Sequence, residues 1–206
     1  IDEYLMGSDL NVDDYPPLLT IPDSVTVDST GVKTSVDLGV ATAEDAKDGV
    51  VVPTIDKVGP YNTGRNIITW SASDKSGNIS TAQQIVDVIP QVTFELSKSV
   101  REGGSVEVIA TLNGSPVEYP VIVPFKVDGS AQKQIDHDLI DGQLVISEGV
   151  SGSLAINTFT DDVIEGVESI ILTMQEITNA ITGSLSNTTV SIYEESIAPK
   201  VSLNIT

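Results

Sequence analysis

Residues 105–112 read SVEVIATL, and this stretch decides the fold class. Apolar side chains stand at every second position from the first valine onward, and most positions between them are polar. An alternation with period two is typical of a strand that buries one face. The same pattern returns in residues 121–127, 144–146 and 170–174. These stretches are therefore predicted to be half-buried strands.

Turn-forming residues separate these strands at intervals of about ten residues. They are Asn113-Gly114-Ser115-Pro116, Asp128-Gly129-Ser130, Asp141-Gly142, Ser147-Glu148-Gly149 and Ser151-Gly152. Short strands with turns at this spacing are typical of a β-sandwich. No long stretch has the 3.6-residue period of an amphipathic helix. The chain is therefore predicted to be all-β.

Two proline positions divide the chain into modules. Pro90 ends a predicted last strand over residues 85–89, and a new strand begins at Val92. A second boundary is expected near Pro199, because residues 199–206 repeat the pattern of residues 90–97, a proline followed by alternating apolar residues. The predicted layout is an acidic linker over 1–15, a module over 16–90, a second module over 91–197, and the truncated start of a further repeat over 198–206.

The charge of the chain points to a cation as partner. Thirty acidic residues stand against ten basic ones, for a formal net charge of -20. A surface of this sign repels phosphate, so nucleic acid is not an expected partner. Solubility alone would explain an even spread of acids. Here several acids cluster at turns, and a divalent cation is the partner that such clusters favour.

Catalysis is not expected, because the usual catalytic and metal-binding residues are missing. The chain has no cysteine and a single histidine, His137. Disulfides, thiolate nucleophiles and zinc sites with two histidines are therefore excluded. A Ser-His-Asp triad would depend on His137 alone, and no Gly-x-Ser-x-Gly motif accompanies it.

No membrane insertion is expected, because no apolar run approaches the length of a membrane helix. The chain shows no secretory leader of its own. It begins with Ile1 rather than Met, and an upstream segment is expected to precede it.

Three stretches of the first module stand out: PPLLTIP at 16–22, ATAEDAKDG at 41–49 and GRNIITWSASDKSGN at 64–78. With them, residues 16–90 resemble the bacterial immunoglobulin-like modules related to the hyalin-repeat (HYR) family. The resemblance implies an immunoglobulin-like β-sandwich. Modules of this kind are usually spacers or adhesion elements in secreted and surface proteins.

Single residues of the first module allow alternative interpretations. Trp70 shares a strand face with Ile68 and Ala72, which predicts a core position, and the alternative is an exposed platform for a sugar. Asp45 and Asp48 are either solvated loop acids or ligands of a cation between modules. The acids of the front segment are predicted to be a solvated linker, with a binding role as the alternative: Asp2, Glu3, Asp9, Asp13 and Asp14.

The second module carries the more specific motifs. VREGG stands at 100–104, DGSA at 128–131 leads to DHD at 136–138, GQLVISEG follows at 142–149, and DDVIEGVES occupies 161–169. With these motifs, residues 91–197 resemble the Calx-β family, the calcium-binding sandwich of sodium/calcium exchangers, integrin β4 and many bacterial surface proteins. The resemblance implies a second immunoglobulin-like β-sandwich in tandem with the first.

The family's calcium ligands carry over, by this resemblance, to seven acids: Glu102, Asp136, Asp161, Asp162, Glu165, Glu168 and Glu194. The acidic loop is one residue shorter than the usual form, so that Thr160 or Val163 stands where a third aspartate is common. The closing aspartate run is replaced by Glu194-Glu195-Ser196. Fewer acids imply one or two calcium ions, with affinities of about 10⁻⁴ to 10⁻³ M as in other extracellular modules. His137 stands where the family has a tyrosine and is expected to be a packed loop residue.

The physical reason for such a cluster is independent of the family. Loops leave a sandwich at its two ends, so acids that are remote in sequence can meet there. Two carboxylates about 5 Å apart repel each other by about 3 kcal/mol at an effective dielectric constant of 20. The acids must therefore bind a cation, splay apart or take up protons. An acidic, solvated end without an ordered metal is the alternative interpretation.

The expected function is a non-catalytic, calcium-binding structural or adhesion segment of a large extracellular or cell-surface multidomain protein of bacterial type. Calcium would rigidify the second module and its junction. The expected partners are calcium and neighbouring modules of the same chain, with a cell-surface protein or glycan as a further candidate. The alternative is an accessory spacer or ligand-binding module of a secreted hydrolase.

Overall fold

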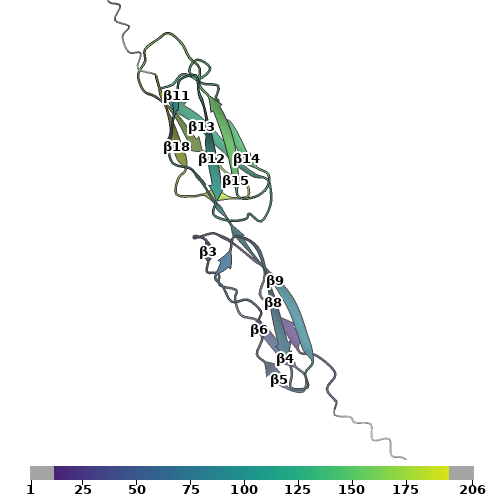
Figure 1. Ribbon diagram of the computed structural model, residues 1–206. Helices are drawn as coiled ribbons and strands as arrows, with labels where there is room; N and C mark the ends of the chain where they lie inside the picture. The colour runs from purple at the N-terminus through teal and green to yellow at the C-terminus, as the bar shows by residue number, and fades with distance from the viewer. Residues whose placement is uncertain (1–11, 195–206) are drawn as a thin grey trace, which may run out of the picture. The chain divides into compact units, whose positions relative to one another are not determined.

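The computed structural model describes residues 12–194, and every regular element in this range is a β-strand (Figure 1). The all-β prediction is confirmed. No helix within residues 12–194 is long and apolar enough to cross a membrane. The described chain divides into two compact units, one of residues 12–27 and 33–88, the other of 28–32 and 89–194. The segment 28–32 was predicted to lie within the first module, and it groups with the second unit.

The first unit consists of short strands and one long hairpin. Its sheets are β1-β4-β5, β2-β9-β8-β6 and β3-β7. The strands are β1 (Leu18–Thr20), β2 (Val25–Asp28), β3 (Lys33–Thr34), β4 (Thr42–Asp45), β5 (Gly49–Val51), β6 (Thr54–Ile55), β7 (Tyr61–Asn62), β8 (Gly64–Ser73) and β9 (Ile79–Ile89). The hairpin of β8 and β9 supplies most of a small core around Ile68, Val86 and Val88.

The only tryptophan is part of the interior of the first unit. Trp70 is 8 % exposed, as predicted from its place on the strand, so its ring has no free face for a sugar. Its indole Nε1 donates a hydrogen bond to Oε1 of the fully buried Gln84 at 3.0 Å. The Gln84 amide nitrogen in turn donates to the carbonyls of Asp23 and Leu38. Buried polar groups need such partners, and this one joins two irregular segments to the hairpin.

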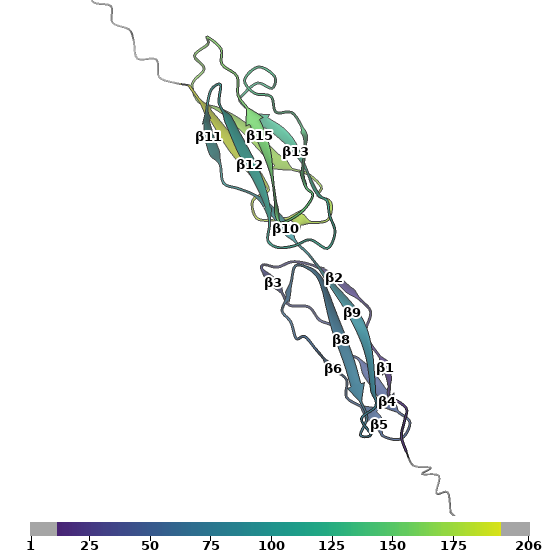
Figure 2. The same ribbon diagram turned by 45° about the vertical axis from the view of Figure 1, so that its right-hand side comes forward.

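The second unit is a sandwich of two sheets, with strand orders β15-β12-β10-β17 and β11-β18-β16-β13-β14 (Figure 2). Its strands are β10 (Gln91–Phe94), β11 (Lys98–Arg101), β12 (Ser105–Leu112), β13 (Val121–Gly129), β14 (Gly142–Ile146), β15 (Ser151–Asn157), β16 (Glu168–Met174), β17 (Ile181–Thr182) and β18 (Asn187–Tyr193). The four strands predicted from alternation are present as β12, β13, β14 and β16, and the strand predicted to begin at Val92 is present as β10.

The core of the second unit lies between its sheets and follows the predicted alternation. In β12, for example, Val108, Ala110 and Leu112 are buried while Ser105 and Glu107 are exposed. The largest fully buried side chains of this core include Phe94, Ile146, Ile156, Ile170 and Leu172. Two predicted turns are displaced. Asp128 and Gly129 belong to the end of β13, because both still pair with β16. Ser151 and Gly152 begin β15, because both pair with the end of β12.

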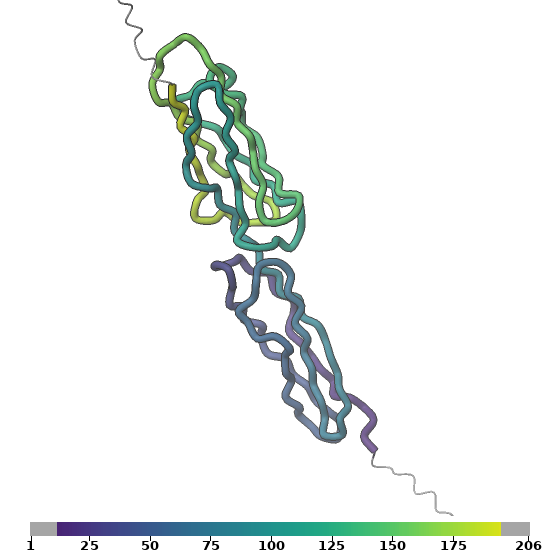
Figure 3. The backbone as a smooth tube through the Cα atoms, in the orientation of Figure 1, coloured from purple at the N-terminus to yellow at the C-terminus, as the bar shows by residue number. Residues whose placement is uncertain are grey.

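Strand direction brings the three loops after β11, β13 and β15, and the end of β18, to one end of the second unit. β11 runs parallel to β18, so both strands end there, at Arg101 and Tyr193. β12 is antiparallel to β15, and β16 is antiparallel to both β13 and β18. The starts of β12 and β16 therefore lie at the same end as the ends of β13 and β15. Figures 1 and 3 show the loops gathered beyond β11, β13 and β18.

Candidate metal centre

The loop between β13 and β14, residues 130–141, is fastened along the end of β15. Asp138 accepts hydrogen bonds from the backbone nitrogen of Asn157 at 2.9 Å and from its side-chain amide at 2.6 Å. The backbone nitrogen of Phe159 donates to the carbonyl oxygen of Asp136 at 2.8 Å. Asp136 is thereby held against the beginning of the acidic loop, residues 158–167.

Asp136 itself is buried and has a defined orientation. It is 7 % exposed, and its Oδ2 accepts a hydrogen bond from the backbone nitrogen of Gln132. A second set of contacts joins this loop to β16, where the backbone nitrogen of Ser169 donates to Ser130 Oγ at 3.0 Å. The start of β16 therefore lies beside Asp136.

Three carboxylates from three elements meet at this place. Glu168 is the first residue of β16, Glu165 belongs to the acidic loop, and Asp136 comes from the loop after β13. Each offers one oxygen, and the three oxygens lie within 4.8 Å of one another. Asp136 is buried, Glu168 is half-buried and Glu165 is exposed. The cluster therefore has an inner wall of protein and an open side.

The proximity of these acids changes their ionisation. Burial, followed by the charges of Asp136 and Glu165, raises the pKa of Glu168 from its ordinary value to about 7. Desolvation and then the charges of Asp136, Asp161, Glu194 and Glu102 raise the pKa of Glu165. With a pKa of about 7, Glu168 is partly protonated at neutral pH when no cation is bound, and this relieves part of the repulsion.

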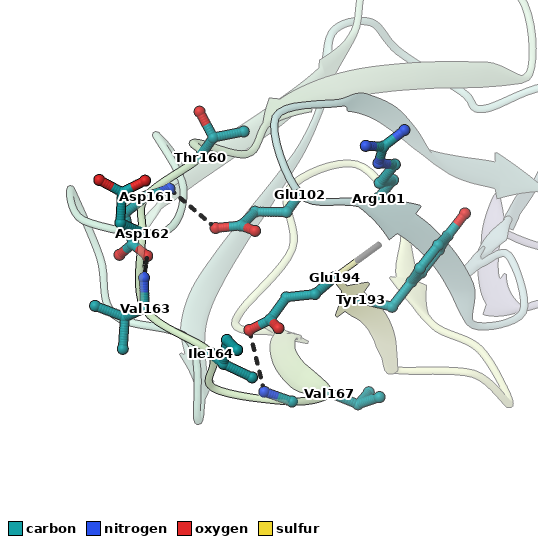
Figure 4. Close-up of a pocket in the computed structure, with 11 residues that line it drawn as sticks. Arg101, Glu102, Thr160, Asp161, Asp162, Val163, Ile164, Val167, Tyr193 and Glu194 are labelled. Atoms are coloured by element: carbon teal, nitrogen blue, oxygen red, sulfur yellow. Dashed lines mark hydrogen bonds between the residues drawn. The ribbon is translucent and has the colours of Figure 1, made fainter. Parts of the chain in front are cut away.

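The other predicted ligands surround an open depression of about 640 Å³ beside the cluster. Glu102, Asp161, Asp162 and Glu194 all line it. In Figure 4, Glu102 and Glu194 extend toward the acidic loop from the turn after β11 and from the end of β18. Glu102 Oε1 accepts a hydrogen bond from the backbone nitrogen of Asp161 at 3.2 Å. Glu194 Oε1 accepts from the backbone nitrogens of Glu165 and Gly166.

All seven predicted ligands thus lie at the same end of the second unit, but only Asp136, Glu165 and Glu168 bring their oxygens together. Glu102 and Glu194 bond to backbone nitrogens of the acidic loop, as does Asp161, whose Oδ1 accepts from Val163 at 2.7 Å. Such bonds hold the loop in place and leave further carboxylate oxygens for a cation. Asp162 lines the depression as an exposed side chain.

His137 is a packed loop residue, as predicted. It is 1 % exposed, and its Nδ1 accepts a hydrogen bond from the backbone nitrogen of Leu139 at 3.1 Å. Desolvation lowers the pKa of its imidazole, so the ring is neutral at pH 7. This histidine contributes packing to the loop that positions Asp136.

Two positioning residues were not anticipated from the sequence. The buried Thr158 accepts a hydrogen bond from Gly104 N and donates to Arg101 O, both at 3.0 Å, and so fixes the turn that carries Glu102. In the same turn Gly103 has φ +72°, and a Cβ there would lie 2.5 Å from the Thr160 side chain. A threonine at the end of a strand has no pattern that marks it. The Glu102-Gly103-Gly104 turn was the available signal.

A second group of acids lies in the first unit. Oxygens of Asp13, Asp45 and Asp48 lie within 4.8 Å of one another. Asp45 is 4 % exposed, so the interpretation of this residue as a solvated loop acid is wrong; its Oδ1 accepts from the backbone nitrogens of Lys47 and Asp48. Lys75 Nζ lies 3.2 Å from Asp48 and supplies positive charge. The predicted linker acids Asp2, Glu3 and Asp9 lie outside the described residues.

Comparisons with known proteins give matches among solved structures. No protein-family profile and no curated protein matches the sequence. The chain is similar to the apo form of the Calx CBD1 domain, with 20 % identity and a TM-score of 0.46 over 52 % of this chain and 99 % of that one. It is also similar to CBD12 of CALX1.2 and to the calcium-binding domain CBD12 of CALX1.1. The CALX1.2 structure is 23 % identical, with a TM-score of 0.45 over 50 % of this chain and 45 % of that one. The CALX1.1 structure is 22 % identical, with a TM-score of 0.46 over 51 % of this chain and 44 % of that one.

These likenesses extend over about half of this chain and under half of the two CBD12 structures. The candidate metal centre is defined by the geometry of the chain's own acids.

Proposed function

We propose that this chain is a non-catalytic, calcium-binding structural segment of a large extracellular or cell-surface multidomain protein. The observation that carries the proposal is the meeting of Asp136, Glu165 and Glu168, whose oxygens lie within 4.8 Å of one another. These residues come from a long loop, an acidic loop and a strand start, so an ion held by all three joins separate parts of the fold.

The ligand chemistry favours calcium over other divalent ions. Calcium takes six to eight hard oxygen ligands in a flexible arrangement. Three clustered carboxylates, with further acids around an open depression, can supply such a shell together with water. Magnesium requires a nearly ideal octahedron and gives up its water reluctantly. Cysteine is absent and the one histidine is packed, so softer metals find no preferred ligands.

Calcium would stiffen the end of the second module. The ion replaces repulsion among the acids with shared coordination, and Glu102 and Glu194 already connect the acidic loop to the ends of β11 and β18. Binding therefore orders the acidic loop and the point at which the chain leaves the last strand. We infer a role as a calcium-stiffened module next to further modules of the same protein.

In this proposal the first module is a spacer. Residues 16–90 are assigned an HYR-like immunoglobulin-like module and residues 91–197 a Calx-β-like one. Such an arrangement suits an adhesion or stalk segment on a bacterial surface, where calcium is plentiful. Its partners would be the neighbouring modules and a cell-surface protein or glycan.

Thermal melting of the whole chain tests the calcium site. Calcium at about 100 times its Kd stabilises a folded unit by about 2.7 kcal/mol. For a unit of about 100 residues this raises Tm by roughly 10 °C or more. We expect this rise in the transition of the second unit, a smaller one with magnesium, and little of it in Glu165→Gln/Glu168→Gln.

A matched control separates coordination from general charge. Glu118→Gln/Glu148→Gln removes the same two charges from exposed positions of the same unit. This variant should keep the full calcium response. An equal response to magnesium, or an equal loss in the control variant, would show charge screening rather than a site and would refute the proposal.

A further inference from the structure

The rim of the depression beside the acidic cluster is apolar. Val163, Ile164 and Val167 of the acidic loop are 58, 83 and 74 % exposed, and Tyr193 is 45 % exposed. All four line the depression (Figure 4). Single exposed apolar residues are ordinary, but a group of them around one concave site marks a surface that binds something. Coordination of a cation does not require these side chains.

The chain leaves the described fold at this same depression. Tyr193 and Glu194 are among its lining residues. Their position is fixed, because the Tyr193 carbonyl accepts from Glu102 N at 3.0 Å and Glu194 Oε1 accepts from the backbone of the acidic loop. The described part of the chain therefore ends at the wall of the depression.

The following residues have the chemistry that this rim would accept. They read Glu195-Ser196-Ile197-Ala198-Pro199-Lys200-Val201 and lie outside the described residues. Ile197 is three residues from Glu194, a reach of about 10 Å in an extended chain. The positive charge of Lys200 complements the carboxylates that also line the depression. So short a connection gives an effective concentration of about millimolar or more, which favours this segment over a separate partner.

We propose that residues 196–201 dock into this depression when calcium is bound, with Ile197 against the aliphatic side chains of the acidic loop. The proposal rests on the calcium site proposed above, because carboxylates without a cation oppose the burial of apolar groups beside them. The docked segment would carry the stiffening effect of calcium from the module into the chain that leaves it.

Amide hydrogen exchange of the 206-residue chain, in calcium and in chelator, tests the docking. We expect calcium to slow exchange at Ile197, Ala198 and Lys200 by about tenfold or more, as local structure does. The double variant Ile164→Ser/Val167→Ser should abolish this protection while its melting transition still responds to calcium. Leu96→Ser is the control: Leu96 is 76 % exposed and outside the depression, so protection should persist.

The outcomes separate the two proposals. Rapid exchange at residues 197–200 with an intact calcium response in melting would overturn the docking and leave the calcium site standing. Loss of both responses would overturn the calcium site as well. Equal protection in chelator would overturn the calcium dependence, and protection that grows with protein concentration would identify a second copy as the source of the segment.

Discussion

Glu168 occupies an unusual position for an acid at the start of a strand. Its carboxylate lies beside Asp136 and Glu165, and burial together with these charges raises its pKa to about 7. In an unfolded chain the same group has an ordinary pKa of about 4.3. The folded protein therefore binds this proton more tightly than the unfolded chain does. The stability that this proton contributes to the folded state is fully present below the unfolded-state pKa, and it is lost as the pH rises through the folded-state pKa of about 7.

A first prediction concerns pH in the absence of calcium. Between pH 5 and 8, the protein with chelator should lose about 5 °C in the melting temperature of the second unit, through deprotonation of Glu168. Glu168→Gln should remove this loss. The lowered pKa of His137 has the opposite effect, because it makes the folded protein more stable as the pH rises toward the ordinary pKa of histidine. Both the original chain and Glu168→Gln contain His137, so the difference between their pH profiles isolates Glu168. Parallel pH profiles for both would contradict the assignment.

A second prediction follows from competition between protons and calcium. Calcium must displace the proton on Glu168, so the rise in melting temperature that it causes should be larger at pH 8 than at pH 5.5. Calorimetric titration in buffers of different ionisation enthalpy should show release of a proton on binding near pH 7. Glu168→Gln should release no proton on calcium binding. Proton release that persists in this variant would mean that another group carries the displaced proton.

The seven acids are also expected to differ in importance. Asp136 is buried with its oxygen in the cluster, whereas Asp162 is an exposed residue of the depression. Asp136→Asn should weaken calcium binding by about tenfold or more, and Asp162→Asn by a few-fold at most. Calcium titration of both variants makes the comparison, with Asp161→Asn/Asp162→Asn as the stronger test of the outer acids. If Asp162→Asn lost more calcium affinity than Asp136→Asn, the calcium site would lie among the outer acids of the depression rather than at Asp136.

At the scale of the elements, the pairing of β13 with β16 places Glu168 where it is. Gly129 ends β13 with φ +131°, and a Cβ on this residue would lie 2.0 Å from the carbonyl oxygen of Ser169. The side chain of Ser169 bonds the loop that carries Asp136. Close approach of the two backbones at Gly129 therefore sets the distance between two of the clustered carboxylates.

Replacement of this glycine should disturb stability and binding together. Gly129→Ala should destabilise the second unit by about 2 kcal/mol or more, because backbone atoms must move apart. Gly149→Ala is the matched control: its φ is +67° and an added Cβ meets nothing within 4 Å, so only the backbone cost of about 1 kcal/mol applies. Urea unfolding and calcium titration give both quantities. Equal effects would mean that contact with Ser169 is unimportant.

At the scale of the whole molecule, the two units can be observed separately. The only tryptophan is buried in the first unit, and the acidic cluster belongs to the second. Tryptophan fluorescence therefore reports unfolding of the first unit, while far-ultraviolet circular dichroism reports both.

Calcium should raise the melting temperature of the transition seen by circular dichroism and leave the fluorescence transition within about 2 °C. Scans of the same sample in calcium and in chelator make the comparison. A rise in the fluorescence transition as well would indicate that Asp13, Asp45 and Asp48 hold an ion in the first unit. Asp45→Asn would then be the variant that removes it.

Local patterns in the sequence were sufficient for the fold class. Alternation with period two predicts β12, β13, β14 and β16, because a strand in a sandwich must bury every second side chain. The same reasoning placed Trp70 in the core. Acids at successive strand ends could be expected at one end of the sandwich, since strand ends are where loops emerge. These inferences need only neighbouring residues and the chemistry of burial.

Only the tertiary structure decided which acids meet. The distances among Asp136, Glu165 and Glu168 depend on the register of β13, β15 and β16, and register is set by pairing between residues far apart in the chain. The burial of Asp45 and the grouping of residues 28–32 with the second unit likewise arise from contacts that local sequence does not encode. Composition can supply the carboxylates, but three oxygens come within 4.8 Å only when distant strands are packed together.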